Sequence, residues 1–149
     1  MGVKLNLCCG DHILPGWVNC DPRAAELGQG VVEWAWGDHY PLADIVLVSY
    51  GFMYLEKLSY MSQLVPIASD GATLIIREDD DRQRKWGNIG QNKRGIGVIK
   101  STSNEDEMAG LMEAAGFRVW RGVPWEYRDV LRGHKTAAKT SYVLTGEGR

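Results

Sequence analysis

Polar residues that could bind a ligand follow each of the first four apolar segments of the chain. They stand at four places in the sequence: Cys8-Cys9-Gly10-Asp11, Asp21-Pro22, Gly37-Asp38 and Ser49-Tyr50-Gly51. In open α/β sheets, ligands bind beyond the carboxyl ends of the strands, at the point where the strand order reverses. Four strand ends of suitable chemistry therefore predict one ligand site at a sheet edge.

The residue types at this edge suit a nucleoside. Gly10 lets the backbone turn tightly and approach a ligand closely. Asp21 can accept hydrogen bonds from both hydroxyls of a ribose, and Asp38 can accept one from an adenine amino group. The simpler alternative is that both aspartates are turn residues. Tyr50 could serve as a base or contact the substrate, although a tyrosine at a strand end more often packs against neighbours.

The chain has three cysteines, Cys8, Cys9 and Cys20. An odd count without a secretion signal fits reduced thiols. We expect Cys8 to be a small core residue and Cys9 to contribute its backbone. No Cys-x-x-Cys spacing or His/Cys cluster is present in the sequence, so no metal site is predicted. His12 lies in the candidate loop, where a ligand contact and an exposed position are equally plausible.

Apolar runs separated by turn residues predict an α/β fold with a mostly parallel sheet of about seven strands. The expected strands cover residues 3–8, 17–20, 31–36, 44–49, 71–76, 117–120 and 140–144. Helical periodicity predicts helices at 55–65 and 104–115. Ser103 is placed to cap the second helix and Gly116 to end it.

The first crossover is unusually short. Only seven residues separate Cys9 from Trp17, whereas a parallel crossover normally needs about a dozen and usually contains a helix. We therefore expect an irregular loop or at most one or two helical turns between the first two strands, and reduced helices on that side of the sheet.

The composition is that of one globular domain, residues 1–149. The apolar fraction is 44%, the charged fraction 24% and the formal net charge -2, which are ordinary values for a globular protein. No apolar run approaches the roughly 18 residues needed to span a bilayer, and the first residues do not form a signal-peptide core. The expected location is the cytoplasm.

Residues 79–100 differ from the rest of the chain. They lack periodicity and are rich in glycine and basic residues, so we expect a mobile loop. Its basic residues, Arg82, Arg84 and Lys85 among them, could bind a phosphate or acidic sugar, and they keep a nucleic-acid partner open. Trp86 and Trp125 lie in polar surroundings and are candidates for a substrate surface.

The opening of the chain resembles the class I S-adenosylmethionine-dependent methyltransferases. The residues that carry the resemblance are Leu5-Asn6-Leu7-Cys8-Cys9-Gly10 followed by Leu14-Pro15-Gly16-Trp17-Val18-Asn19-Cys20-Asp21. They are similar to a small subgroup that opens with Leu-Asn-Leu-Gly-Cys-Gly and continues with Gly-Trp-x-Asn-x-Asp. Ala114-Ala115-Gly116-Phe117 resembles a later segment of the same family, so the resemblance covers most of the chain.

The resemblance implies a Rossmann-like sheet that binds S-adenosylmethionine. It implies a cofactor site made of the following residues: Leu7, Cys8, Cys9, Gly10, Asp11, His12, Asp21, Pro22, Gly37, Asp38, Ser49 and Tyr50. Within that set, Asp21 would hold the ribose, Asp38 the adenine, and Ser49-Tyr50 would lie beside the methionine end. The implied acceptor is a small molecule or a saccharide, and a homo-oligomer stays open.

Two departures from the family pattern leave an alternative open. Cys8 stands where the family has its first motif glycine, and only Leu55-Glu56 remains of a His-x-Leu-Glu-His pattern. The alternative is a non-catalytic domain of the same fold that acts as a binding or assembly module. A dinucleotide site is disfavoured, because no second or third glycine follows Gly10.

Overall fold

The computed structural model describes the parts of the chain that form the sheet, one long helix and the first crossover. The described residues are 3–9, 12–21, 30–33, 43–49, 61, 68–79, 90–91, 98–99, 104–131 and 141–148.

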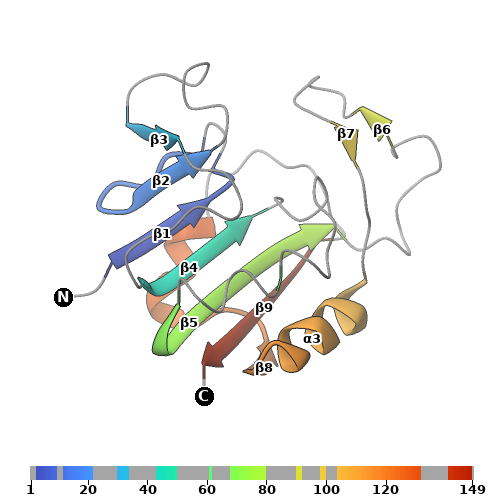
Figure 1. Cartoon of the computed structure of the whole chain (residues 1–149). Coiled ribbons are helices and arrows are strands. Elements are labelled where there is room, and N and C mark those ends of the chain that lie inside the picture. Colours follow the sequence, from blue (N-terminus) through green and yellow to red (C-terminus); the bar gives the residue numbers. More distant parts are fainter. Residues whose placement is uncertain are drawn as a thin grey trace.

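Seven strands form one sheet in the order β3-β2-β1-β4-β5-β9-β8 (Figure 1). Their bounds are Val3–Leu7 (β1), Val18–Asp21 (β2), Val31–Glu33 (β3), Ala43–Ser49 (β4), Ala68–Asp79 (β5), Phe117–Arg121 (β8) and Ser141–Gly148 (β9). Strands β3, β2, β1, β4 and β5 are all parallel to one another. Strand β9 runs antiparallel to both of its neighbours, β5 and β8. The predicted α/β fold with a mostly parallel sheet is confirmed.

Strand β4 has the sequence of a strand that is covered on both faces. Its alternate residues Val46 and Val48 pack into one apolar cluster, while Ile45 and Leu47 pack into the other. A near-continuous apolar run is what such a strand requires, because neither face meets water. The run predicted at 44–49 therefore falls at the centre of the sheet.

The helix predicted at 104–115 is present as α3, Glu105–Ala114. Its N-cap is Asn104, whose side-chain oxygen accepts a hydrogen bond of 2.8 Å from the backbone N–H of Glu107. The predicted cap at Ser103 is therefore wrong: the cap is one residue later, because Asn104 has the extended backbone that a cap needs. The predicted end is confirmed by Gly116, which has a φ of +102°.

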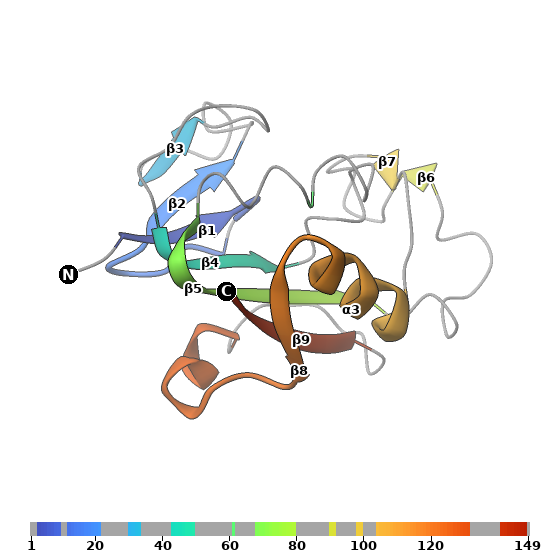
Figure 2. The same ribbon diagram turned by 60° about the horizontal axis from the view of Figure 1, so that its bottom comes forward.

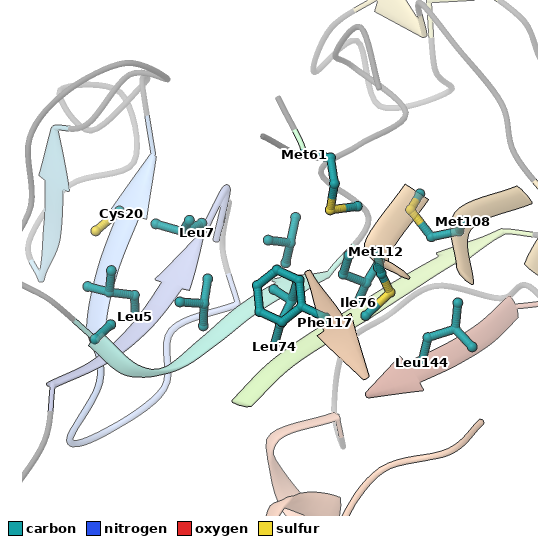
Figure 3. Packing of buried hydrophobic residues seen from close by; sticks show 13 residues of the cluster. Leu5, Leu7, Cys20, Met61, Leu74, Ile76, Met108, Met112, Phe117 and Leu144 are labelled. Carbon is teal, nitrogen blue, oxygen red and sulfur yellow. The ribbon is translucent and has the colours of Figure 1, made fainter. Parts of the chain in front are cut away.

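Helix α3 covers one face of the sheet with apolar side chains (Figure 3). Met108 and Met112 lie against Leu74 and Ile76 of β5, Leu144 of β9 and Phe117, in the same cluster as Leu5 and Leu7 of β1. Gly146 of β9 makes this close packing possible. A Cβ atom at that position would lie 2.9 Å from the Cβ of Phe117 and 3.0 Å from the Cε of Met112.

The opposite face is covered by the first crossover and a short 3-10 helix. Figure 2 shows α3 and the 3-10 helix η4, Trp125–Leu131, on opposite sides of the sheet. Leu14 of the crossover packs on Ile45, Leu47 and Ile75, with Trp17 and Tyr127 partly buried beside it. None of the described crossover residues, 8–9 and 12–17, is helical, as predicted from the short spacing.

Two predicted segments are described only in part. Of the helix predicted at 55–65, the structure describes Met61, which is helical and buried in the α3 cluster. Within 79–100, Asp79 belongs to β5, and β6 (Gly90–Gln91) pairs with β7 (Val98–Ile99) as a small antiparallel sheet.

Candidate functional site at the carboxyl edge of the sheet

The strand order reverses at β1, which pairs with β2 on one side and with β4 on the other. In Figure 1 the arrowheads of β1, β2 and β4 all point to the same edge. Leu7 is level with Cys20 of β2 and with Val48 of β4. Asp21 and Ser49 are each one residue further on, two strand spacings apart, or about 10 Å. The predicted strand ends thus meet where a ligand crevice is expected.

Cys8 makes the turn that leaves β1. Its φ is +54°, and it is the one residue other than glycine with a positive φ among the described residues. This left-handed region is sterically costly for any side chain and favours glycine, which is the residue that the resembled family has here. Cys8 is also partly exposed, so its predicted core position is wrong. The turn carries the side chain away from the interior.

Cys9, rather than Cys8, is the buried cysteine of the loop, with 4% exposure. Its backbone N–H donates to the carbonyl of Cys20 at 3.0 Å, and its own carbonyl accepts from the N–H of His12 at 2.9 Å. The backbone of Cys9 therefore helps to hold the loop, and its predicted contribution to a ligand site stays a prediction. The first bond joins the start of the loop to β2. The second joins the start of the loop to its end at His12.

Two buried asparagines hold the loop from the inner side. Both belong to the segments that carry the family resemblance, but no role was predicted for them. The Nδ2 of Asn6 donates to the carbonyl of His12 at 2.8 Å and to the Oδ1 of Asn19 at 2.9 Å. Asn19 in turn bonds the backbone of Leu14 and Trp17. A usable signal existed: asparagine is depleted in strands, yet one sits inside each strand that flanks the short crossover.

Asp21 ends β2 with 3% exposure. Its register neighbour on β3 is Glu33, which is exposed. Aspartate is rarely buried to this extent unless its carboxylate is paired or hydrogen-bonded. Of these two acidic residues at the same edge, Asp21 is therefore the one whose carboxylate is held in a defined place.

The other predicted site residues are described incompletely or not at all. Leu7 is fully buried in the α3 cluster, so its side chain does not face the edge. His12 is partly buried, and the backbone of Ser49 pairs with β5 at Arg77. Six predicted residues lie outside the described part of the chain: Gly10, Asp11, Pro22, Gly37, Asp38 and Tyr50.

Among the described residues, pKa shifts are resolved for Arg121 and Tyr127, and neither residue belongs to the predicted site. Burial raises the pKa of Tyr127, with smaller contributions from Glu126 and from Asp44 near the start of β4. Tyr127 packs, partly buried, against the apolar cluster that contains Leu14 and Ile45. Trp125, proposed above for a substrate surface, is 81% exposed on the same short helix, with the guanidinium of Arg128 4.3 Å from its ring. Its companion Trp86 is outside the described residues.

Neither a metal cluster nor a membrane-spanning helix is found in the described segments. Among those residues, no three His, Cys, Asp or Glu side chains gather in a way that could hold a metal ion. No helix among them is both long and apolar enough to cross a membrane.

The fold is that of the class I S-adenosylmethionine-dependent methyltransferases. No protein-family model and no curated protein matches the chain. Solved structures do match it. A Thermotoga maritima methyltransferase, described as a possible histamine N-methyltransferase, has a TM-score of 0.69 at 15% identity, over 100% of this chain and 83% of that one.

Two further structures carry the cofactor or its product. Human N-acetylserotonin methyltransferase in complex with S-adenosylmethionine has a TM-score of 0.65 at 11% identity, over 99% of this chain and 47% of that one. The magnesium protoporphyrin IX methyltransferase of Synechocystis PCC 6803, with bound S-adenosylhomocysteine, gives 0.62 at 14%, over 99% and 74%. The chain thus spans about half the length of the human enzyme. At these identities the likeness establishes the fold.

Proposed function

We propose that the protein binds S-adenosylmethionine at the carboxyl edge of β2, β1 and β4 and transfers its methyl group to an acceptor. The observation that carries the proposal is the pairing of two features at the point of strand reversal. A left-handed turn at Cys8 follows β1, and a buried carboxylate at Asp21 ends the neighbouring strand. That combination suits a nucleoside ligand, because the turn admits it closely and the carboxylate accepts from ribose hydroxyls.

The described residues at this edge fit the cofactor. Asp21 would hold the ribose, and the turn from Cys8 to His12 would lie against the methionine part. Ser49 at the end of β4 would border the same space. Gly10, Asp11, Pro22, Gly37, Asp38 and Tyr50 complete the proposed set from their positions in the sequence.

The protein's contribution to catalysis would be alignment. When bound, S-adenosylmethionine supplies an electrophilic methyl group on a sulfonium sulfur. The chain's own task is to hold the acceptor's nucleophile in line with that methyl group, and positioning of this kind can supply much of a rate enhancement. A general base is optional for such a displacement, and Tyr50 is the candidate by position.

The proposed acceptor is a small molecule or a saccharide. The structural neighbours are named for substrates of very different shape: histamine, as a possible substrate, N-acetylserotonin and magnesium protoporphyrin IX. The proposed class of acceptor therefore rests on the family resemblance of the sequence, and its identity is left to experiment.

A non-catalytic binding module is the second candidate, and Cys8 is the observation that favours it. Its side chain occupies a left-handed turn where the resembled family has glycine. That side chain takes up room beside the proposed methionine subsite, which would weaken cofactor binding or prevent turnover.

Calorimetric titration with S-adenosylmethionine and S-adenosylhomocysteine tests the binding site. We expect wild-type protein to bind both, and Asp21→Asn to bind at least about tenfold more weakly, because an amide is a poorer acceptor for ribose hydroxyls than a carboxylate. Glu33→Gln is the matched control, since Glu33 is the exposed register neighbour of Asp21. No heat and no thermal shift at millimolar ligand would refute the proposal.

Turnover separates the two candidates. Protein incubated with methyl-labelled S-adenosylmethionine and a panel of amine, phenol, carboxylate and saccharide acceptors should yield one labelled product. Cofactor binding without any product across the panel would favour the binding module instead.

A further inference from the structure

The two asparagines beneath the candidate cofactor loop are almost completely buried. Asn6 of β1 has 1% exposure and Asn19 of β2 has 5%. Leu5 and Leu7 pack toward α3, so the alternation of the strand turns Asn6 to the opposite face, where the first crossover lies. Burying two amides costs free energy unless they are hydrogen-bonded, so their partners indicate what they do.

Asn19 uses its full hydrogen-bonding capacity on the crossover and on Asn6. Its Nδ2 donates to the carbonyls of Leu14 at 3.1 Å and Trp17 at 3.2 Å. Its Oδ1 accepts from the backbone N–H of Leu14 at 2.9 Å and from the Nδ2 of Asn6 at 2.9 Å. One side chain thus bonds both the backbone N–H and the backbone C=O of Leu14, as a residue on a neighbouring antiparallel strand would.

Asn6 uses only its donor group. Both Nδ2 hydrogens are directed to acceptors, the carbonyl of His12 and the Oδ1 of Asn19. Its Oδ1 is buried and has no hydrogen-bond partner among the described residues. The amide cannot be reversed, because an oxygen in place of Nδ2 would face two acceptors. Within the described part of the chain, the acceptor of Asn6 therefore has no partner, while both of its donor hydrogens bond the loop and Asn19.

The length of the crossover explains why amides are used here. A crossover helix satisfies its own backbone groups, but the residues between β1 and β2 are too few for one and none described is helical. Buried backbone groups still need partners. The two side chains supply them, and a continuous series of hydrogen bonds runs from Cys20 through Cys9 and His12 to Asn6 and Asn19.

We propose that Asn6 and Asn19 form an amide bridge that positions the Cys8–His12 turn for cofactor binding. The proposal rests on the proposed function, since it assigns positioning residues to the same site. The bridge fixes His12 at the far end of the turn, and the bond from Cys9 to Cys20 fixes the near end. Loss of the bridge releases the far end while the sheet and the α3 core stay intact.

Asn6→Leu tests the bridge, because it removes both donors while keeping a side chain that branches at the same atom. Thr145→Val is the matched control: Thr145 is also fully buried, and its hydroxyl donates to a loop carbonyl, that of Gly122, at 2.7 Å. Thr145 lies on β9, three strand spacings from β1, or about 14 Å. Both variants should lower the thermal midpoint by a similar amount.

We expect S-adenosylhomocysteine to bind Asn6→Leu about tenfold more weakly than wild type, and Thr145→Val as tightly as wild type. If Asn6 positions the turn, its loss weakens cofactor binding by more than the loss of stability explains. If Asn6 only stabilises the fold, the two variants have the same affinity. Equal loss of affinity in both variants, or wild-type affinity in Asn6→Leu, would overturn the proposal.

Hydrogen exchange on the wild-type protein without cofactor supplies a second measurement. The Leu14 amide lies outside any helix or strand and is bonded to Asn19, so it should exchange far more slowly than an unstructured peptide. Unprotected exchange at Leu14 would mean that no bridge exists. Protection at Leu14 in a wild-type protein that binds no cofactor would refute the proposed function and the cofactor role of the bridge together, and leave the bridge as a structural element.

Discussion

The first crossover and the α3 layer cover opposite faces of one sheet by different means. Helix α3 satisfies its own backbone and contributes apolar side chains, with Met108 and Met112 fully buried. The crossover has no described helical turn, and two buried amides bond its backbone. Apolar burial is non-directional, whereas a hydrogen bond depends on distance and angle.

This difference corresponds to what each region has to do. A layer that only covers the sheet can tolerate small shifts of its side chains, and methionine adapts well to irregular gaps. A turn that receives a ligand has to keep one backbone conformation, which directional bonds enforce. We therefore expect substitutions in the α3 layer to change stability, and substitutions around the crossover to change cofactor affinity.

The largest expected effect on stability lies in the α3 layer. Met112→Ala should lower the free energy of unfolding by about 2–5 kcal/mol, because a fully buried side chain is lost and a cavity remains. Urea denaturation measures it, and calorimetry on the folded variant should give an unchanged affinity for S-adenosylhomocysteine.

Met112→Leu is the control for that substitution. It conserves most of the volume, so its cost should be below about 1.5 kcal/mol. If Met112→Ala weakened cofactor binding as strongly as Asn6→Leu, the contrast between the two regions would be lost.

Periodicity and turn residues predicted the sheet well because each local signal agreed with the global fold. The apolar run at 44–49 became the central strand β4, and Gly116 ended α3 in a left-handed conformation. The edge of the sheet that gathers Asp21 and Ser49 followed from the rule for parallel strands. What these signals share is that each depends on short stretches of sequence.

The errors arose where two neighbouring residues offered the same local chemistry. Ser103 and Asn104 are both capping types, and each has an acidic residue three positions later. Positions 8 and 9 are both cysteine, and only the conformation of the turn decides which of the two side chains is buried. The asparagine bridge was missed because it joins residues 13 positions apart, Asn6 and Asn19, through a loop with no periodic pattern.

An intermediate effect is expected at the start of α3. Asn104→Ala should cost about 1 kcal/mol of stability, because the backbone N–H of Glu107 loses its acceptor. Asn104→Ser should retain most of that stability, and neither variant should change cofactor affinity. Chemical denaturation of both variants measures the difference. A larger loss in Ser103→Ala than in Asn104→Ala would move the cap back to the residue that the sequence analysis favoured.

The smallest expected effect is at Cys8, and its sign is opposite. Cys8→Gly should stabilise the protein by about 0.5 kcal/mol, because relief of the left-handed backbone slightly exceeds the added flexibility of the unfolded chain. Cys8→Ala removes the thiol but keeps the Cβ atom, so it should give no such gain. Denaturation and calorimetry on both variants separate the effect of the backbone conformation from the effect of the thiol.

Cofactor affinity at Cys8 then links this residue to the bridge. If the asparagines impose the turn, its φ of +54° is set from outside and any residue at position 8 has to adopt it. Cys8→Gly should in that case bind S-adenosylhomocysteine more tightly than wild type, and the gain should disappear in the double variant with Asn6→Leu. Additive effects of the two substitutions would mean that the turn keeps its conformation without the bridge.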